Sequence, residues 1–584
     1  MSYLILGINA YHGDSSACLV RDGSIMAAGE EERFRRVKHW AGFPKEAIRY
    51  CLSEAGISLA DLDVVAINQD PRANFWRKIG YTALHWPRLS LVIDRLKNKR
   101  KRASVKEELA GAFPGELLRA EVCHVEHHLA HLASTFLVCP HKDATVVSVD
   151  GFGDFASAAW GVGHGSGIQI EKKVYFPHSL GIFYQALTQY LGFQKYGDEY
   201  KVMGLAPYGR PLHMGLMRRI VQLQNDGRFK LDLSYFRHHR ERIDYQWENG
   251  EPTVGVLFSQ VLVDLLGPPR RKGEDLTQRH RDIACSMQAM YEEAFFHLLN
   301  RLHERHALDT LALAGGCAMN SVANGRIYRY TPFRSVYIQS AAGDAGGAIG
   351  AAVAVVAERG ILEKPFHMDH AYWGPEYAND YIAALCRKEK DTLEREDCLV
   401  RCVPDEGQLV QAVAQAIERG LVIGWFQGRM EWGPRALGNR SILADPRRPD
   451  IKEILNLKIK RRESFRPFAP SVLREHVADW FETDDDVPFM MQVYQIREER
   501  RAIIPAVTHV DGSGRLQTVQ QHTNPRYYRL IEAFRKLTGV PMLLNTSFNE
   551  NEPVVCKPEE ALACFLRTKM DVLVLGDWVI TRAG

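Results

Sequence analysis

The densest group of residues able to do chemistry is the stretch "HVEHHLAH" at 124–131, which holds four histidines in eight residues. If a strand ends near Val125 and a helix begins at Glu126, His127 and His131 lie at i and i+4 on one helix face. Two imidazoles so placed can bind one metal ion. The metalloprotease pattern HExxH has the same spacing, but His128 occupies the position of its glutamate base, so a protease is disfavoured.

Two aspartates are the best candidates for the remaining metal ligands. Asp150 in "VSVDGFGD" and Asp344 in "AAGDAGG" each follow a predicted strand, at the strand end where open α/β folds place ligands. A set of two histidines and two aspartates without a thiolate suits iron(II), zinc or manganese better than copper(I). Spacing alone leaves two interpretations open, a metal site and a hydrogen-bonded histidine cluster at the surface.

Three Gly-rich turns at 150–154, 315–320 and 343–347 predict a nucleotide site. Each turn by itself is more typical of a positive φ or of close helix packing. Three of them in one domain, each after a strand and two before helices, could hold a nucleotide triphosphate on backbone N–H groups. The residues expected to line this ATP or adenylate site are Gly151, Gly153, Asp154, Gly315, Gly316, Asn320 and Gly343.

The C-terminal part carries a second group of polar motifs: "EWGPRALGNRSILADPR" at 431–447, "KIKRRESFRPFAPS" at 458–471 and "LLNTSFNENEPV" at 543–554. Arginine binds phosphate or carboxylate in a bidentate manner, lysine neutralises an anion, and Ser and Asn complete the hydrogen bonding. Surface salt bridges are the alternative. The Trp, Phe and Pro residues among these motifs favour a partly buried pocket for a small oxyanion.

The elements that must position these residues follow an α/β pattern. Strand, polar turn and strand open the chain, and a similar arrangement recurs at 144–171, which predicts an internal duplication. Residues 71–120 are interpreted as a mostly helical insertion with the basic run "RLKNKRKR" at 95–102, a solvated face or a patch for a polyanion. A helix over 280–306, strands near 310–315 and 335–340 and a small-residue helix follow. We expect one domain over 1–365 and a second over 366–584, with strands at 421–426 and 571–580.

Composition limits the class of protein. The chain has 584 residues, of which 46% are hydrophobic, and its formal net charge is +3. This balance gives no bulk attraction to nucleic acid or to an anionic membrane, although local patches remain open. Eleven cysteines without a CxxC pair indicate reduced thiols. With no signal-peptide pattern and no apolar run of about 18 residues, we expect a cytoplasmic protein with no membrane partner and no nucleic-acid partner.

Several motifs together resemble one enzyme family. They include "INAYHGDSSACLV", "EHHLAHLASTF", "VDGFGD", "EYKVMGLAPYG", "GGCAMNSVANGRI", "GDAGGAIGAA", "GRMEWGPRALGNRSILADPR", "FRPFAPSV" and "LNTSFNENEPVV". In this order they are similar to the O-carbamoyltransferases of nodulation-factor, cephamycin and tobramycin biosynthesis, over nearly the whole chain. The insertion at 71–120 is not covered.

The resemblance implies a fold and a reaction. The N-terminal domain is expected to be a duplicated actin-like ATPase (ASKHA) domain, similar to the tRNA threonylcarbamoyl-transfer protein. The C-terminal domain is expected to be an α+β domain like the threonylcarbamoyl-adenylate synthases (YrdC-like). In such enzymes carbamoyl phosphate and ATP give a carbamoyl adenylate, and the carbamoyl group then passes to a hydroxyl of a small molecule.

The resemblance also implies residue roles. The metal ligands are His127, His131, Asp150 and Asp344, with iron(II) as the expected ion, although another divalent metal suits the same donors and Mg²⁺ can accompany ATP. His12 matches the general base on the acceptor hydroxyl, a task that suits an imidazole, and His39 is expected nearby. The residues expected to hold carbamoyl phosphate are Arg435, Lys460, Arg466, Arg515, Asn545 and Ser547.

The sequence disfavours two other functions. Transfer of a threonylcarbamoyl group to tRNA is disfavoured by the near-zero net charge and by the fused carbamoyl phosphate pocket. A nucleotide-binding scaffold or regulatory protein without turnover is disfavoured because the His/Asp set and the arginine motifs are complete. The sequence names neither the acceptor nor the oligomeric state, for which a monomer and a homodimer both stay open.

Overall fold

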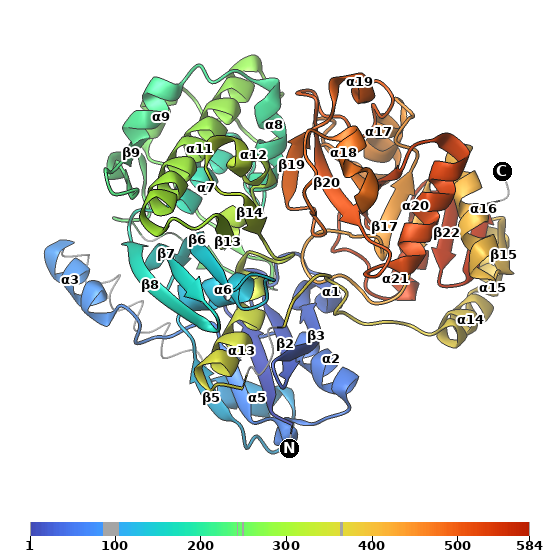
Figure 1. Cartoon of the computed structure of the whole chain (residues 1–584), viewed down its shortest axis with the longest axis horizontal. Coiled ribbons are helices and arrows are strands. Elements are labelled where there is room, and N and C mark those ends of the chain that lie inside the picture. The colour runs from blue at the N-terminus through green and yellow to red at the C-terminus, as the bar shows by residue number, and fades with distance from the viewer. Residues whose placement is uncertain are drawn as a thin grey trace. The chain divides into compact units, whose positions relative to one another are not determined.

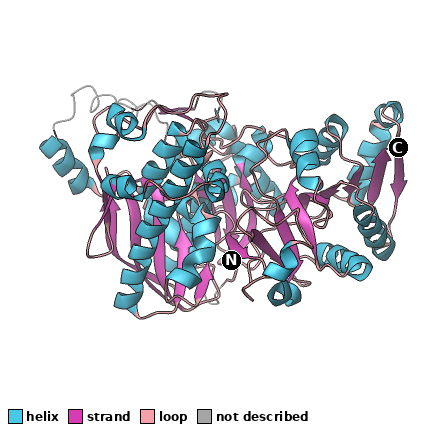
Figure 2. Cartoon of the chain, turned by 90° about the horizontal axis from the view of Figure 1, so that it is seen from above, coloured by secondary structure: helices cyan, strands magenta, loops and turns pink. Residues whose placement is uncertain are grey.

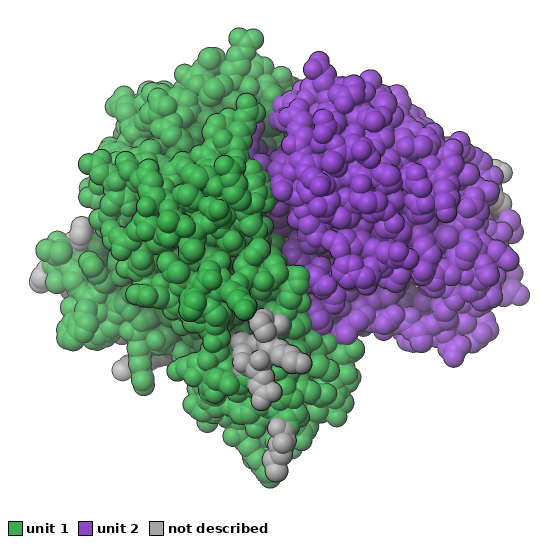
Figure 3. Space-filling model, in the orientation of Figure 1, with its two compact units in different colours: residues 1–320, 327–368 green, residues 321–326, 369–584 purple. Residues whose placement is uncertain are grey.

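The computed structural model describes residues 2–85, 104–241, 243, 245–247, 250–361 and 366–582. The basic run at 95–102 lies outside these residues, as do residues 362–365 beside the expected domain boundary. The chain divides into two compact units, residues 1–320 with 327–368 and residues 321–326 with 369–584 (Figure 3). Each unit is described by itself.

Unit 1 is built on two five-stranded sheets that repeat one strand order (Figures 1 and 2). In the first, β3-β2-β1-β4-β5, strand β1 is antiparallel to β2 and parallel to β4. In the second, β8-β7-β6-β13-β14, strand β6 is antiparallel to β7 and parallel to β13. This repeat confirms the predicted duplication and the actin-like α/β fold. The strands are β1 (Leu4–Asn9), β2 (Ser16–Arg21), β3 (Ser24–Glu30), β4 (Val64–Ile67), β5 (Glu121–His124), β6 (Asp143–Gly153), β7 (Ala156–His164), β8 (Gly167–Tyr175), β13 (Thr310–Ala314) and β14 (Ser335–Tyr337).

The strands form because apolar, largely β-branched and small residues run continuously through them and are buried, as in "LILGIN" and "TLALA". Helix α6 (His127–Phe136) packs on β6 and β13, α13 (Gly347–Glu358) packs on β1 and β2, and the two helices pack against each other. Gly350 permits this contact, since a Cβ there would lie 1.8 Å from the Ala130 carbonyl oxygen. The histidines of α6 that are expected to bind a metal ion are thereby held between the two sheets.

Further helices and short strands complete unit 1. They are α1 (Glu31–Arg35), α2 (Lys45–Ala55), α3 (Phe75–His85), α5 (Val105–Ala112), α7 (Leu180–Tyr190), α8 (Glu199–Leu205), α9 (Met214–Ile220), β9 (Val221–Leu223), β10 (Phe229–Leu231), β11 (Tyr245–Gln246), β12 (Thr253–Val254), α10 (Gln260–Leu266), α11 (Gln278–His306) and the second half of α12 (Ser321–Tyr330), whose residues 321–326 belong to unit 2. The long helix expected over 280–306 is confirmed as α11. None of the helices within the described ranges has the length and apolar character needed to cross a bilayer.

Unit 2 is an α+β fold around one mixed nine-stranded sheet, in the order β15-β23-β22-β16-β17-β21-β18-β20-β19. Its strands are β15 (Cys398–Cys402), β16 (Ile423–Phe426), β17 (Arg440–Ala444), β18 (Ala469–Leu473), β19 (Gln492–Gln495), β20 (Ser513–Val519), β21 (Met542–Ser547), β22 (Val572–Leu575) and β23 (Trp578–Arg582). Its helices are α14 (Asn379–Lys388), α15 (Lys390–Arg395), α16 (Glu406–Glu418), α17 (Ile451–Ile454), α18 (Val477–Trp480), α19 (Glu498–Arg501), α20 (Pro525–Thr538) and α21 (Pro558–Arg567). The single strand expected over 571–580 is instead the hairpin β22–β23, because the chain turns at Gly576 with φ +54.

Candidate active site

Helix α6 brings the two predicted histidine ligands together. Glu126 caps the helix, since its Oε2 accepts a hydrogen bond from the Leu129 N–H at 2.9 Å. One helical turn separates His127 from His131, and their Nε2 atoms lie 3.0 Å apart. Both rings are buried. The two imidazoles therefore converge on one point, as their i, i+4 spacing predicted.

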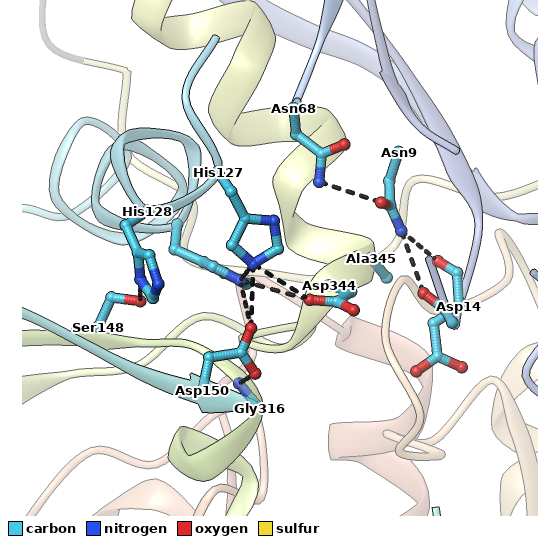
Figure 4. Close-up of polar contacts among 12 residues, drawn as sticks. Asn9, Asp14, Asn68, His127, His128, Ser148, Asp150, Gly316, Asp344 and Ala345 are labelled. Atoms are coloured by element: carbon cyan, nitrogen blue, oxygen red, sulfur yellow. Dashed lines mark hydrogen bonds and ion pairs between the residues drawn. The ribbon is translucent and has the colours of Figure 1, made fainter. Parts of the chain in front are cut away.

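The two predicted carboxylates reach the same point from separate elements (Figure 4). Asp150 Oδ2 lies 3.0 Å from His127 Nε2 and 3.3 Å from His131 Nε2. Asp344 Oδ1 lies 3.7 and 3.4 Å from the same two nitrogens. Asp150 is oriented by the Gly316 N–H, which donates to its Oδ1 at 2.9 Å. The surface-cluster interpretation fails, because these histidines are buried and face two carboxylates.

The donor set fits a divalent metal ion. Burial by itself would lower the pKa of His131, but hydrogen bonding to Asp150 and Asp344 and their negative charge raise it to about 9. The same histidines keep the pKa of Asp150 well below its usual range despite burial. A divalent cation can replace the protons that hold this group together, and two imidazoles with two carboxylates suit iron(II), manganese or zinc.

The His127 ring is positioned by packing as well as by its carboxylate partners. A Cβ at Gly153 would lie 2.0 Å from the ring, so only glycine fits there. The Nδ1 atoms of His127 and His131 are buried and have no hydrogen-bond partner within the described part of the chain. A metal-binding histidine commonly donates from its other ring nitrogen to an acceptor; the His127 ring is instead fixed by contact with Gly153 of β6.

His12 lies beside this centre, on the turn between β1 and β2. Its ring centroid is 5.2 Å from that of His127. Asn9 holds the turn by donating from Nδ2 to the carbonyl oxygens of Gly13 at 3.3 Å and Asp14 at 2.9 Å, and Asn68 Nδ2 donates to Asn9 Oδ1 at 3.0 Å. The expected general base and the expected metal ligands therefore share one site.

His39 joins the same turn through a carboxylate. Its Nδ1 lies 2.7 Å from Asp14 Oδ1, and its backbone N–H donates to Glu32 Oε2 at 2.8 Å. Desolvation disfavours the imidazolium, but the charge and hydrogen bond of Asp14 outweigh it and raise the pKa of His39 to about 9. Near neutral pH His39 is therefore a cation paired with Asp14, which makes it a weaker proton acceptor than a neutral imidazole.

Of the residues expected at the nucleotide, three glycines lie against the candidate metal ligands or their strand: Gly153, Gly315 and Gly316. A Cβ at Gly343 would lie 3.9 Å from the Gly316 Cα. Gly315 has φ +91, and a Cβ there would clash with the Val149 carbonyl oxygen. Asn320 is held by Gln288, with which it exchanges two side-chain hydrogen bonds of 3.0 and 3.1 Å. Three loops thus meet next to Asp150, as a nucleotide site would require.

Asp154 has a structural position that its sequence context did not indicate. It forms the two-residue turn between β6 and β7 with Phe155, and both have positive φ, +46 and +72. Its Oδ2 accepts hydrogen bonds from the backbone N–H groups of His127 at 3.0 Å and Asp70 at 2.8 Å. The carboxylate therefore holds the start of α6, and with it the first metal histidine.

The residues expected to bind carbamoyl phosphate lie in unit 2. Lys460, on the π-helix Leu455–Lys460, is buried, and its Nζ contacts Ser547 Oγ at 3.3 Å and Asn549 Oδ1 at 2.8 Å. Asn545 is also buried and donates from Nδ2 to the Ala436 carbonyl at 3.1 Å, next to Arg435. The motifs at 431–447, 458–471 and 543–554 are thus brought together. Arg466 pairs with Glu463 at 2.6 Å.

Arg515 reaches this group from β20 and is its most unusual member. Burial and the positive charges of Arg435 and Arg462 lower the pKa of its guanidinium. Its Nε is buried and has no hydrogen-bond partner among the residues that the structure describes. Like charges gathered in a buried place favour an anion between them.

Sequence reasoning missed three residues of these sites. Arg462 lies beside Arg515. Asn549 contacts the Lys460 ammonium, as Ser547 does. The Tyr196 hydroxyl would be 2.4 Å from a Cβ at Gly13, next to His12. Arg462 and Asn549 stand inside the quoted motifs and could have been selected there. Tyr196 precedes the motif at 199–209 and carries no signal of its own.

Comparisons with known proteins show the family to which the chain belongs. A family model described as the carbamoyltransferase N-terminus matches residues 4–353, and one described as the carbamoyltransferase C-terminus matches residues 414–582. An uncharacterized protein of Synechocystis is 41% identical over 619 positions, covering 99% of this chain and 97% of that protein.

Two relatives have functional names. Nodulation protein NolNO of Sinorhizobium fredii is 39% identical over 581 positions, covering 98% of this chain and 80% of that protein. A 3'-hydroxymethylcephem-O-carbamoyltransferase of Amycolatopsis lactamdurans is 34% identical over 277 positions, covering 47% of this chain and 49% of that enzyme. Since both domain models match in order over most of its length, this chain belongs to the carbamoyltransferase family.

Proposed function

We propose that this carbamoyltransferase uses carbamoyl phosphate and ATP to form a carbamoyl adenylate and then passes the carbamoyl group to a hydroxyl of a small-molecule acceptor. The observation that carries the proposal is the cluster of cations in unit 2. Arg515 is buried near Arg435 and Arg462, and their positive charges and the burial disfavour the charge on Arg515. A bound phosphate would offset that repulsion and receive bidentate hydrogen bonds.

The first step assigned to unit 2 is hydrolysis of carbamoyl phosphate, in which one water molecule admitted to the pocket attacks the carbamoyl carbon, its protons are released, and carbamate and inorganic phosphate form. Lys460 and Arg515 would neutralise the phosphate as the carbonyl–oxygen bond breaks. Carbamate is a poor electrophile and decomposes in water, so the buried setting of Lys460 and Asn545 serves to exclude solvent. Carbamate then attacks the α-phosphate of ATP, pyrophosphate leaves, and the carbamoyl carbon gains AMP as a good leaving group.

The second step is assigned to unit 1. There the acceptor hydroxyl attacks the carbamoyl carbon, His12 takes the hydroxyl proton, and AMP leaves. Iron(II) or another divalent ion held by His127, His131, Asp150 and Asp344 would supply Lewis-acid stabilisation of developing negative charge. The Gly315–Gly316 and Gly343 loops beside Asp150 would place the adenylate. The imidazolium of His39, held by Asp14, adds positive charge near the turn that carries His12.

Three finer features belong to the same proposal. The domain division places adenylate formation in the C-terminal domain and transfer in the N-terminal domain. The acceptor is a small molecule and not a nucleic acid. We place the protein in the cytoplasm, because all eleven of its cysteines are free.

The test is release of AMP and pyrophosphate from ATP by the metal-loaded protein, with and without carbamoyl phosphate. We expect release that depends on carbamoyl phosphate. Arg515→Ala should lower kcat/KM for carbamoyl phosphate by about 100-fold or more, as removal of a charged transition-state contact does. Arg401→Ala, at an exposed arginine of β15, is the matched control. AMP and pyrophosphate release that is the same with and without carbamoyl phosphate would refute the proposal. So would an Arg515→Ala protein as active as the control.

A further inference from the structure

Helix α3 presents its apolar face to solvent. Trp76 is 81% exposed and Leu84 is 83% exposed, and Phe75 and Ile79 are exposed as well. Phe75 and Ile79 share a face of the helix because they are four residues apart, and Trp76 lies on the adjoining part of the helix surface. Exposed single residues are ordinary, but an apolar stripe along one helix indicates an interaction surface.

The opposite side of α3 is fixed to unit 1. The Tyr81 ring lies 5.1 Å from Phe176 and 5.9 Å from Phe155, and the Arg77 guanidinium lies 4.8 Å above the Tyr175 ring. Asn74 Nδ2 donates to the Asp154 carbonyl oxygen at 2.8 Å. The aromatic and polar contacts therefore point inward, and the apolar stripe is held outward at the edge of the unit (Figure 1).

Charge identifies the kind of surface that this stripe would meet. Residues 71–85 contain Arg72, Arg77 and Lys78 and no acidic residue. Residues 86–103, which lie outside the described structure, add seven basic residues and one acidic residue in the sequence. Because the whole chain has a formal charge of only +3, the remainder of the chain is net negative. In the sequence, positive charge is thus concentrated in α3 and the segment that follows it.

We propose that the exposed face of α3, formed by Phe75, Trp76, Ile79 and Leu84, docks on an anionic lipid bilayer. A helix with Trp, Phe and Leu on one face and flanking Arg and Lys lies in the plane of the membrane interface, where Trp is favoured and cations meet lipid phosphates. A protein partner would be expected to require matching carboxylates, whereas a lipid surface needs only negative charge and an apolar layer. The proposal departs from the expectation, based on net charge and the lack of a spanning run, that no membrane takes part.

The experiment is flotation of the full chain with vesicles of phosphatidylcholine alone and with about one third phosphatidylglycerol. We expect the protein to float with the anionic vesicles, to float less at high salt, and to float at least about tenfold less with neutral vesicles. Trp76→Ser with Leu84→Ser should lower the anionic partition coefficient at least about tenfold, because two large apolar side chains no longer enter the interface.

Leu212→Ser with Leu399→Ser is the matched control, because both leucines are 66% exposed and lie outside α3. It should bind vesicles as the wild type does, and both double variants should keep the thermal midpoint of the wild type. Failure to float with anionic vesicles, or flotation unchanged by the α3 substitutions, would overturn the proposal. So would a dimer in light scattering that the α3 substitutions convert to a monomer, which would assign the face to a second copy of the chain.

Discussion

Asp14 and His39 form an ion pair in the proposed transfer site whose strength depends on pH. The pKa of His39 is raised to about 9, above its ordinary value of 6.5. A raised pKa in the folded state means that the pair stabilises the protein fully below about pH 6.5 and loses this effect as the pH rises through 9. Asn at position 14 would keep the left-handed backbone, φ +57, that Asp14 adopts.

Asp14→Asn should therefore lower the thermal midpoint at about pH 6 and leave it nearly unchanged at about pH 10. The measurement is thermal unfolding of the variant and the wild type at both pH values, with the His39 imidazole titration followed by NMR. A deficit of equal size at both pH values would show that Asp14 acts through shape and not through charge.

How far the sequence predicted the sites depends on how local their signals are. His127 and His131 are one turn apart, and Asp150 and Asp344 follow strands, so their convergence could be anticipated without a structure. Arg515 was predicted as a binding residue only from the family resemblance, because nothing near it in the sequence indicates that β20 places it beside Arg435 and Arg462. Tyr196 was missed because its contact with Gly13 depends on the tertiary fold alone.

Among the elements, the β6–β7 turn stores backbone strain next to the metal ligands. Asp154 and the bulky Phe155 both have positive φ, a conformation that costs roughly 1–3 kcal/mol per residue outside glycine. The strain is offset by the two hydrogen bonds that Asp154 accepts from backbone N–H groups and by packing of the Phe155 ring, whose centroid is 5.4 Å from that of Phe176. We interpret Asp154 as a positioning residue for His127.

Asp154→Ala should weaken metal binding about 10- to 100-fold, since outer-shell contacts of metal ligands have effects of this size. Asp22→Ala is the matched control: Asp22 also has a left-handed backbone in a hairpin turn and accepts a backbone N–H, that of Tyr3 at 2.6 Å. Titration with cobalt(II) or manganese(II) measures the affinity directly. Equal affinities in the two variants would contradict a positioning role.

Element types were predicted better than their ends. The buried strands and α11 follow from continuous apolar runs and from helical periodicity. The expected single strand at 571–580 was wrong because the chain turns back at Gly576. Of the turn expected at 150–154, residues 150–153 belong to strand β6, which has a register shift between Val149 and Gly153. Local sequence does not report where pairing with a neighbouring strand ends.

At the scale of the whole molecule, the proposed metal centre joins segments from distant parts of unit 1. Its ligands lie on α6, on β6 and just before α13. An ion that binds the folded site and not the unfolded chain raises stability by mass action, about 2.7 kcal/mol at 100 times its dissociation constant.

Iron(II) or manganese(II) should therefore raise the unfolding midpoint of the wild-type protein. His127→Ala with His131→Ala should abolish the increase, and the conservative change Asp344→Asn should reduce it. Calorimetry with and without the ion measures the effect. An increase that persists in the histidine double variant would place the ion elsewhere.

The packing of α6 and α13 has a consequence for how unit 1 can fold. Helix α6 leaves the last strand of the first sheet and covers the second, whereas α13 leaves the last strand of the second sheet and covers the first. Each half of unit 1 thus supplies a helix that covers the sheet of the other half. Neither half could bury its own sheet if the chain were divided between Leu137 and Asp143, so the duplicated halves are obligate partners that gain and lose their structure together.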